Sequence, residues 1–189
     1  MTLKHYFEKN AVYYVTSVTY KRKKIFADVT TARFLLTTIL YHKYILEFKL
    51  FGYVIMPDHF HILIQPSEKY NLSQIMRAIK GNFARKYNEW YYNNNTQFNQ
   101  GSRRLSADYN VDYKRDYRGW VYIPVWQEGY YETVMRDEKD VVNRLNYIHN
   151  NPVRKNLVDE PSKYEFSSWH QYFGKIREGI QIPIDKIDF

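Results

Sequence analysis

Residues 48–65 read FKLFGYVIMPDHFHILIQ, two apolar runs separated by Pro57 and Asp58. Both runs are rich in β-branched and aromatic residues, which are common in strands, and a proline followed by an aspartate is typical of a turn. The spacing therefore predicts two strands, at residues 48–56 and 59–65, joined as a hairpin. Such a hairpin supplies two neighbouring antiparallel strands of a sheet.

The two histidines of this stretch, His59 and His61, alternate with apolar residues. Side chains two residues apart in a strand project from the same face, so both imidazoles share one face. Phe60, Ile62 and Ile64 then point to the other face and are expected in the core. Two neighbouring imidazoles can hold one divalent cation. The pattern also fits a pair of structural histidines, and spacing alone does not decide between the two.

Strand and helix patterns continue on both sides of the hairpin. Residues 93–118 are rich in asparagine and basic residues and poor in aliphatic ones, which predicts a long loop or insertion. Pro152 should end the last helix near Asn151, because a proline disfavours helical backbone in the residue before it. The other elements are expected as a strand at residues 11–20, a helix from Thr30 or Thr31 to about residue 47, a helix from Asn71 or Ser73 to about residue 91, a strand at residues 120–126 and a helix from Asp137 or Asp140.

The elements follow the order strand, helix, strand, strand, helix, strand, helix. This order predicts an α+β fold, a ferredoxin-like or RRM-like α/β sandwich with a central antiparallel sheet and its helices on one face. A length of 189 residues favours a single domain over residues 1–189, with the basic polar insertion inside it.

The composition favours a nucleic-acid partner. The formal net charge is +8, and aromatic residues make up 19% of the chain, with 20 tyrosines. A basic chain is attracted to polyanions and exposed aromatic rings stack on unpaired bases, so the combination favours single-stranded nucleic acid. The same residues could also serve as ordinary core and surface side chains.

Missing features exclude several classes of protein. The chain has no cysteine, which rules out disulfides, thiolate zinc sites and cysteine nucleophiles. It has no apolar stretch of about 20 residues, so neither a membrane span nor a membrane partner is expected. Residues 1–10 are polar and do not look like a secretory signal, and these features together predict a cytoplasmic protein.

A metal held by two histidines needs a further ligand from another part of the chain. The last predicted helix offers Tyr147, His149, Asn150 and Asn151. Tyr147 and Asn151 are four residues apart and therefore lie on one face of the helix. The amide oxygen of Asn151 could complete a metal site while Tyr147 reaches the substrate. Alternatively, Asn151 caps the end of the helix and Tyr147 packs its ring.

Several of these segments together resemble a known family. His59-Phe60-His61 resembles the histidine–hydrophobic–histidine (HUH) motif of single-tyrosine transposases, and the most similar group is the transposases associated with repetitive extragenic palindromes (REP elements). The likeness covers most of the chain outside residues 93–118, which depart from a compact family core. The supporting segments are Tyr14-Val15-Thr16, IMRAIKGNF at residues 75–83, Trp126-Gln127-Glu128-Gly129-Tyr130, Arg136, YIHNNPV at residues 147–153 and Phe166-Ser167-Ser168-Trp169.

The resemblance implies an enzyme that nicks and rejoins DNA. It implies Tyr147 as the catalytic nucleophile, with a 5′-phosphotyrosine intermediate, and Asn151 as the third metal ligand beside His59 and His61. The implied metal is Mg²⁺ or Mn²⁺, and the implied partner is single-stranded DNA with a hairpin or palindromic repeat. Members of these groups act as monomers or homodimers. The group that activates the tyrosine stays open between the metal, Lys80 and a water molecule.

Basic side chains are candidates for contacts to the DNA backbone. Each of them would fit a solvated surface charge equally well. Trp126 and Tyr130 could stack on bases, although we expect Trp126 in the core. The basic candidates are Arg77, Lys80, Arg85, Arg103, Arg104 and Arg136.

Two other functions fit parts of the sequence. A non-catalytic binder of single-stranded nucleic acid could use the aromatics of an RRM-like sheet, but it would leave His59, His61 and Tyr147 without a common task. A domesticated transposase that serves its host would keep the same catalytic residues, so the sequence does not separate it from a mobile enzyme.

Overall fold

The computed structural model describes residues 8, 10–94, 112–117, 121–174 and 181–187. The α+β class expected from the sequence is confirmed. The strands are β1 Val12–Val18, β2 Lys49–Met56, β3 His59–Gln65, β4 Lys114–Arg115, β5 Val121–Tyr122 and β6 Tyr131–Met135. The helices are η1 Tyr20–Arg22, η2 Ile25–Ala27, α1 Val29–Leu46, α2 Leu72–Asn94, α3 Glu138–Arg154, η3 Pro161–Lys163 and α4 Trp169–Tyr172.

The main sheet has four antiparallel strands in the order β2-β3-β1-β6. The predicted hairpin is confirmed, because β2 pairs with β3 across the Pro57-Asp58 turn. In β3, His61 faces Thr16 of β1 on one side and Val54 of β2 on the other. The histidine strand is therefore an interior strand, held on both edges by hydrogen-bonded neighbours.

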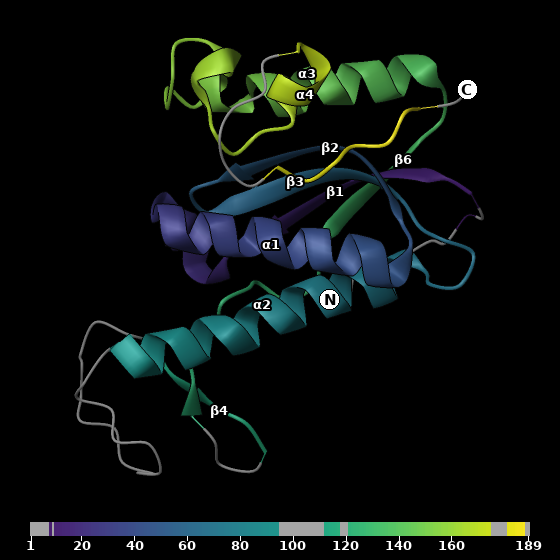
Figure 1. Ribbon diagram of the computed structural model, residues 1–189. Coiled ribbons are helices and arrows are strands. Elements are labelled where there is room, and N and C mark those ends of the chain that lie inside the picture. The colour runs from purple at the N-terminus through teal and green to yellow at the C-terminus, as the bar shows by residue number, and fades with distance from the viewer. Residues whose placement is uncertain (1–7, 9, 95–111, 118–120, 175–180, 188–189) are drawn as a thin grey trace.

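Helices cover both faces of the sheet (Figure 1). α1 and α2 pack on one face, where Phe60 and Ile62 lie fully buried in the larger core. α3 packs on the opposite face, where Leu145 joins a second core with Val54 and Leu63. The expectation that all helices share one face is therefore wrong. β2 and β3 carry apolar side chains on both faces, and each face needs a helical cover.

The helices begin at capping side chains. The carboxylate of Asp28 accepts from the backbone N–H of Thr31 at 2.9 Å, so α1 starts earlier than the predicted threonine caps. Asn71 and Gln74 bond reciprocally at the start of α2, as in a capping box, which confirms the predicted asparagine. Asp137 caps α3, as expected.

The fourth strand of the main sheet is β6, not the predicted strand at residues 120–126. Of its described residues, 121–126, only Val121 and Tyr122 form a strand, and they pair with β4 outside the main sheet. Pro124 interrupts the segment because it has no N–H to donate to a ladder. Trp126 keeps a single bridge to Thr19 at the end of β1.

The helix α3 continues past Pro152 to Arg154, so the predicted end at Asn151 is wrong. A proline this close to the end of a helix removes a single backbone donor. The last turn is closed by the N–H of Lys155, which donates to the carbonyl of Asn151 at 3.1 Å.

The predicted insertion at residues 93–118 is described only near its ends. Asn93 and Asn94 belong to α2, while Lys114 and Arg115 form β4. Residues 95–111 and 118–120 lie outside the described residues. Within the described ranges, no helix is long and apolar enough to span a membrane.

Candidate active site

The two histidines of β3 lie side by side on the sheet face that α3 covers. Their ring centroids are 4.8 Å apart, and His59 and His61 are only 8% and 5% exposed. The predicted shared face is confirmed. Burial lowers the pKa of His61 to about 3 and also lowers the pKa of His59, so both rings are neutral at neutral pH, the form that binds a metal.

Two hydroxyl groups of β1 orient the ring of His61. The hydroxyls of Tyr14 and Thr16 each lie 2.8 Å from its Nδ1. The ring of Tyr14 also stacks on the imidazole, with centroids 5.3 Å apart. Nε2 is the remaining ring nitrogen of His61, and it is buried without a hydrogen-bond partner among the described residues.

A carboxylate orients the ring of His59. Nδ1 of His59 lies 2.5 Å from one oxygen of Asp58, and the other oxygen accepts from the guanidinium of Arg22 at 3.0 Å. When Nδ1–H donates to Asp58, Nε2 of His59 keeps its lone pair. This is the arrangement in which a carboxylate fixes the tautomer of a metal-ligating histidine.

The helix α3 brings Tyr147 to the histidine pair. Its ring centroid is 5.7 Å from that of His61 and 6.1 Å from that of Tyr14, both in edge-on geometry. Leu145, two residues earlier, is buried against the sheet and holds this part of the helix in place. The Tyr147 hydroxyl forms no hydrogen bond with the described residues and is available to a substrate.

Asn151 lies one turn after Tyr147 on α3 and is only 1% exposed. Both atoms of its carboxamide group are buried without a hydrogen-bond partner in the described part of the chain. Leaving such a group unsatisfied costs roughly 1–3 kcal/mol, so it calls for a partner that the described residues do not supply. A capping role for its side chain, the alternative raised by the sequence, does not occur here.

These donors fit a divalent cation. The site offers two neutral imidazoles and one amide oxygen, and unpartnered atoms occur on both His61 and Asn151. Among the described residues there is no group of three or more His, Cys, Asp or Glu side chains suited to a metal. A ligand set with both histidines would therefore need a residue of another type, and the buried carboxamide of Asn151 is a candidate.

Two arginines of α3 lie beside the tyrosine rings of the site. The guanidinium of Arg154 lies 5.0 Å from the ring centroid of Tyr147, and that of Arg144 lies 4.9 Å from the ring centroid of Tyr14. Arg144 also contributes to the lowered pKa of His61 through its charge. These two arginines were not predicted from the sequence, because their relation to the site depends on how α3 docks on the sheet.

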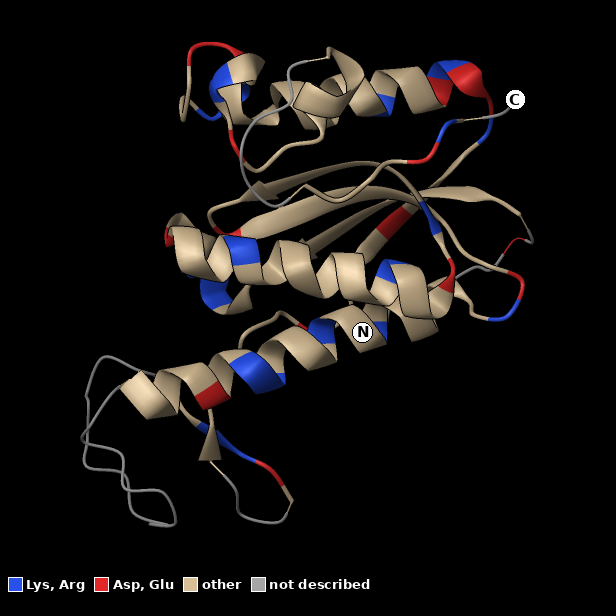
Figure 2. Cartoon of the chain, in the orientation of Figure 1, with Lys and Arg blue, Asp and Glu red and all other residues tan. Residues whose placement is uncertain are grey.

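The basic residues predicted to contact DNA are spread over the molecule. Figure 2 shows Lys and Arg positions along α1, α2 and α3, helices that lie on both sides of the sheet. Arg77, Arg85 and Arg136 are exposed and stay candidates for backbone contacts. Arg103 and Arg104 lie outside the described residues.

Lys80 has a different environment from the other candidates. Its ammonium group donates to the carbonyls of Gln127, at 3.2 Å, and Gly129, and it lies 5.8 Å from the ring centroid of Trp126. α2 packs on the face opposite Tyr147, so Lys80 is not placed to activate the tyrosine. Burial lowers its pKa to about 8.

The two aromatic candidates for base stacking are both engaged inside the protein. Trp126 packs against the rings of Phe26, Phe60 and Phe83, and its indole N–H donates to a backbone carbonyl at 3.0 Å. Its expected core role is confirmed. Tyr130 is only 7% exposed and shares a hydrogen bond with a serine of α2, so it does not offer a face for stacking.

A family model described as "Transposase IS200 like" matches residues 8–117, more than half of the chain. The chain belongs to the IS200-like transposase family. The matched range contains the His59 and His61 strand with its partner β1, but it ends before α3. The roles of Tyr147 and Asn151 in this transposase family member therefore depend on the geometry described above.

Two curated proteins of Haemophilus influenzae are similar to this chain. One is named as a REP-associated tyrosine transposase and is 28% identical over 118 residues, 62% of this chain and 56% of that protein. The other is named only as an uncharacterized protein and is 31% identical over 107 residues, 53% of this chain and 52% of that protein. The chain thus matches little more than half the length of these relatives.

A solved structure shares the fold over the whole chain. It is described as a REP-associated tyrosine transposase bound to a REP hairpin, with a TM-score of 0.67 and 21% sequence identity. The match covers 100% of this chain and 94% of that chain. At this level of identity the likeness supports the fold.

Proposed function

We propose that this chain is a metal-dependent enzyme that nicks and rejoins single-stranded DNA near hairpins, with Tyr147 as its nucleophile. The observation that carries the proposal is the approach of Tyr147, on α3, to the ring of His61, on β3, with centroids 5.7 Å apart. A phenol beside two oriented, neutral imidazoles is an arrangement for covalent catalysis at a phosphate. Membership of a transposase family supports the same reaction class.

His59, His61 and Asn151 would hold Mg²⁺ or Mn²⁺. The unpartnered Nε2 of His61 and carboxamide of Asn151 support this ligand set, as does the Asp58 carboxylate behind His59. Two nitrogen ligands favour Mn²⁺ over Mg²⁺, which prefers oxygen. When bound, the ion would polarise the scissile phosphate and offset its negative charge.

The reaction exchanges one phosphate ester for another. The phenol oxygen of Tyr147 bonds to phosphorus while the bond from phosphorus to the 3′-oxygen breaks, giving a 5′-phosphotyrosine and a 3′-hydroxyl. Tyr147 loses a proton and the leaving oxygen gains one. Because the ester bond energy is kept, a later 3′-hydroxyl can attack the phosphotyrosine, rejoin the strand and release the tyrosine without ATP.

Charge supports a DNA substrate at this site. Arg154 and Arg144 flank the tyrosines beside His61, where they can offset charge on the phosphate and the phenolate. The chain as a whole carries a net charge of +8. The solved relative is described with a REP hairpin bound, which supports hairpin-bearing DNA as the partner of this chain.

Cleavage of labelled hairpin oligonucleotides from the DNA flanking the gene tests the proposal. Wild type, Tyr147→Phe and the exposed control Tyr44→Phe would be run on a denaturing gel with Mn²⁺, with Mg²⁺ and with a chelator. We expect a covalent protein–DNA band that needs metal, disappears in Tyr147→Phe and is unchanged in the control. Binding without any covalent product would favour a non-catalytic binding protein. An adduct that persists in Tyr147→Phe would mean that another residue is the nucleophile.

A further inference from the structure

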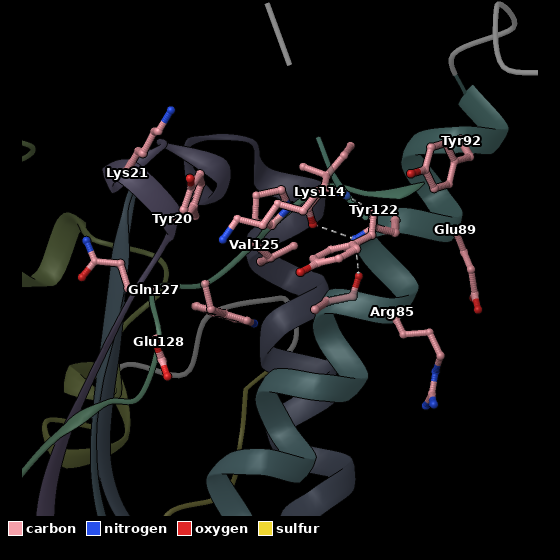
Figure 3. Close-up of a pocket in the computed structure, with 15 residues that line it drawn as sticks. Tyr20, Lys21, Arg85, Glu89, Tyr92, Lys114, Tyr122, Val125, Gln127 and Glu128 are labelled. Atoms are coloured by element: carbon pink, nitrogen blue, oxygen red, sulfur yellow. Dashed lines mark hydrogen bonds between the residues drawn. The ribbon is translucent and has the colours of Figure 1, made fainter. Parts of the chain in front are cut away.

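A pocket of about 1000 Å³ lies between η1, the C-terminal half of α2 and residues 121–128 (Figure 3). Its lining includes the buried side chains of Ile123 and Val125 and the aromatic rings of Tyr20 and Tyr122. This volume is in the range of pockets that bind small organic groups. None of these residues belongs to the site that holds Tyr147.

A cation and an aromatic ring stand next to each other in this pocket. Lys114 and Tyr122 are directly paired residues of β4 and β5. Their side chains therefore project from the same face, with Cβ atoms about 5 Å apart. Tyr122 is 39% exposed, and the ammonium of Lys114 lies 4.8 Å from the ring centroid of Tyr20. Lys114 forms no ion pair with any described residue.

The other polar groups at the rim differ in what they can bind. Lys21 is already paired with Asp112 at 2.9 Å, whereas Lys114 and Arg85 of the lining form no ion pair with described residues. Of these two, Lys114 is directly paired with Tyr122 and is therefore the anion partner next to that ring. Gln127 and Glu128 lie together at another part of the rim (Figure 3). Their side-chain oxygens can accept hydrogen bonds from the amino groups of nucleobases.

The pocket is tied to the strand end that carries His59. The N–H of Tyr20 donates to the carbonyl of Val125 at 2.8 Å, which joins η1 to the pocket wall. The preceding residue, Thr19, donates its N–H to the carbonyl of Asp58 at 2.9 Å, directly before His59. Residues 19 and 20 therefore connect the pocket wall to the end of the strand that carries the histidine pair.

We propose that this pocket binds one unpaired nucleotide of the single-stranded DNA substrate, with its base against Tyr122 and a phosphate at Lys114. The proposal rests on the proposed function, because it takes the substrate of Tyr147 to be a single strand. An unpaired base offers a flat face to a tyrosine, and its phosphate offers the anion that Lys114 lacks. A base-paired stem has no unstacked base to place against the Tyr122 ring, so an unpaired nucleotide fits this open pocket better.

The test measures binding of fluorescein-labelled hairpin oligonucleotides by anisotropy in the non-cleaving Tyr147→Phe background. The single-stranded flank is scanned with abasic sites, which remove one base at a time. We expect one abasic position to weaken binding at least about fivefold, and we expect that loss to disappear when Tyr122→Ala is added. Tyr44→Ala, an exposed tyrosine on α1 outside the pocket, should leave the abasic profile unchanged.

Lys114→Ala gives a second readout that does not depend on the aromatic ring. It should reduce the slope of log affinity against log salt concentration by about one, as expected for one lost phosphate contact. The proposal is overturned if Tyr122→Ala and Lys114→Ala both keep the parental abasic profile and salt slope. The two hypotheses fail separately. If wild type forms the adduct but Tyr122→Ala leaves the abasic profile unchanged, only the pocket proposal is refuted. If Tyr122→Ala removes the abasic effect but wild type forms no adduct, only the proposed nicking activity is refuted.

Discussion

Substitution of Gly52 by alanine tests how α3 is held against the sheet. A Cβ at this position would lie 2.5 Å from Cδ2 of Leu145, whereas carbon atoms in contact are about 3.5–4.0 Å apart. Its other neighbours, Ser168 and Ile148, would be at ordinary contact distances of 3.5 and 3.9 Å. The new methyl group must therefore displace the Leu145 side chain or α3 itself by about 1 Å.

The expected loss of unfolding free energy is about 1–3 kcal/mol, the usual effect of overpacking a core. Leu145→Ala removes the atom in conflict, although by itself it should destabilise the protein by about 2–5 kcal/mol. In the Leu145→Ala background, Gly52→Ala should leave the free energy of unfolding almost unchanged, because the new methyl group enters the vacated space. The double-mutant cycle should therefore show a favourable coupling of about 1–3 kcal/mol.

Urea unfolding of wild type, Gly52→Ala, Leu145→Ala and the double variant measures this coupling. The yield of the covalent adduct measures how far the displacement of α3 affects Tyr147. Gly81→Ala is the matched control, since a Cβ there meets nothing within 4 Å. It should stabilise the protein by up to about 1 kcal/mol, as alanine replaces glycine in a helix. Strictly additive effects of Gly52→Ala and Leu145→Ala would refute this account of how α3 docks.

Three further predictions concern groups around the site. Asp58→Asn should weaken Mn²⁺ binding about 10–100-fold in titration calorimetry, because it removes the charge that orients His59, and an unchanged affinity would contradict that role. Arg154→Gln should slow adduct formation in a rapid-quench time course by about tenfold, whereas Arg154→Lys should retain part of the rate. Burial lowers the pKa of His149 to about 4, so its contribution to stability falls as pH drops from 6.5 towards 4, where the unfolded chain binds the proton more readily. His149→Gln should reduce that loss in urea titrations by roughly 1–3 kcal/mol, while a pH profile identical to wild type would exclude the effect.

Local periodicity was enough to predict the parts of the site that lie within one element. The shared face of His59 and His61 follows from the two-residue period of a strand, and the shared face of Tyr147 and Asn151 follows from the four-residue spacing of a helix. Both spacings are properties of the backbone. They hold wherever the elements pack, so each pair of neighbours could be predicted from spacing. The roles of Tyr147 as nucleophile and Asn151 as metal ligand came instead from the resemblance to single-tyrosine transposases.

The contacts between elements were not predictable in the same way. The docking of α3 on the face opposite α1 and α2, and with it the roles of Arg144 and Arg154, depends on tertiary packing. β6 was missed because this edge strand, YETVM, is largely exposed and carries little of the apolar signal that marks a strand. The hydroxyls of Tyr14 and Thr16 could have been found, since antiparallel pairing puts Thr16 beside His61.

Peptide mapping of the adduct tests directly whether Tyr147 is the residue that becomes covalently linked to DNA. Trypsin would cut after Arg144 and Arg154 and release the peptide LNYIHNNPVR, in which Tyr147 is the only tyrosine. Mass spectrometry of the nuclease-trimmed and trypsin-digested adduct then assigns the link. We expect a nucleotide joined through its 5′-phosphate to Tyr147 in this peptide. A nucleotide linked to any other peptide, such as the one that carries Tyr14, would contradict the role of Tyr147 as the nucleophile.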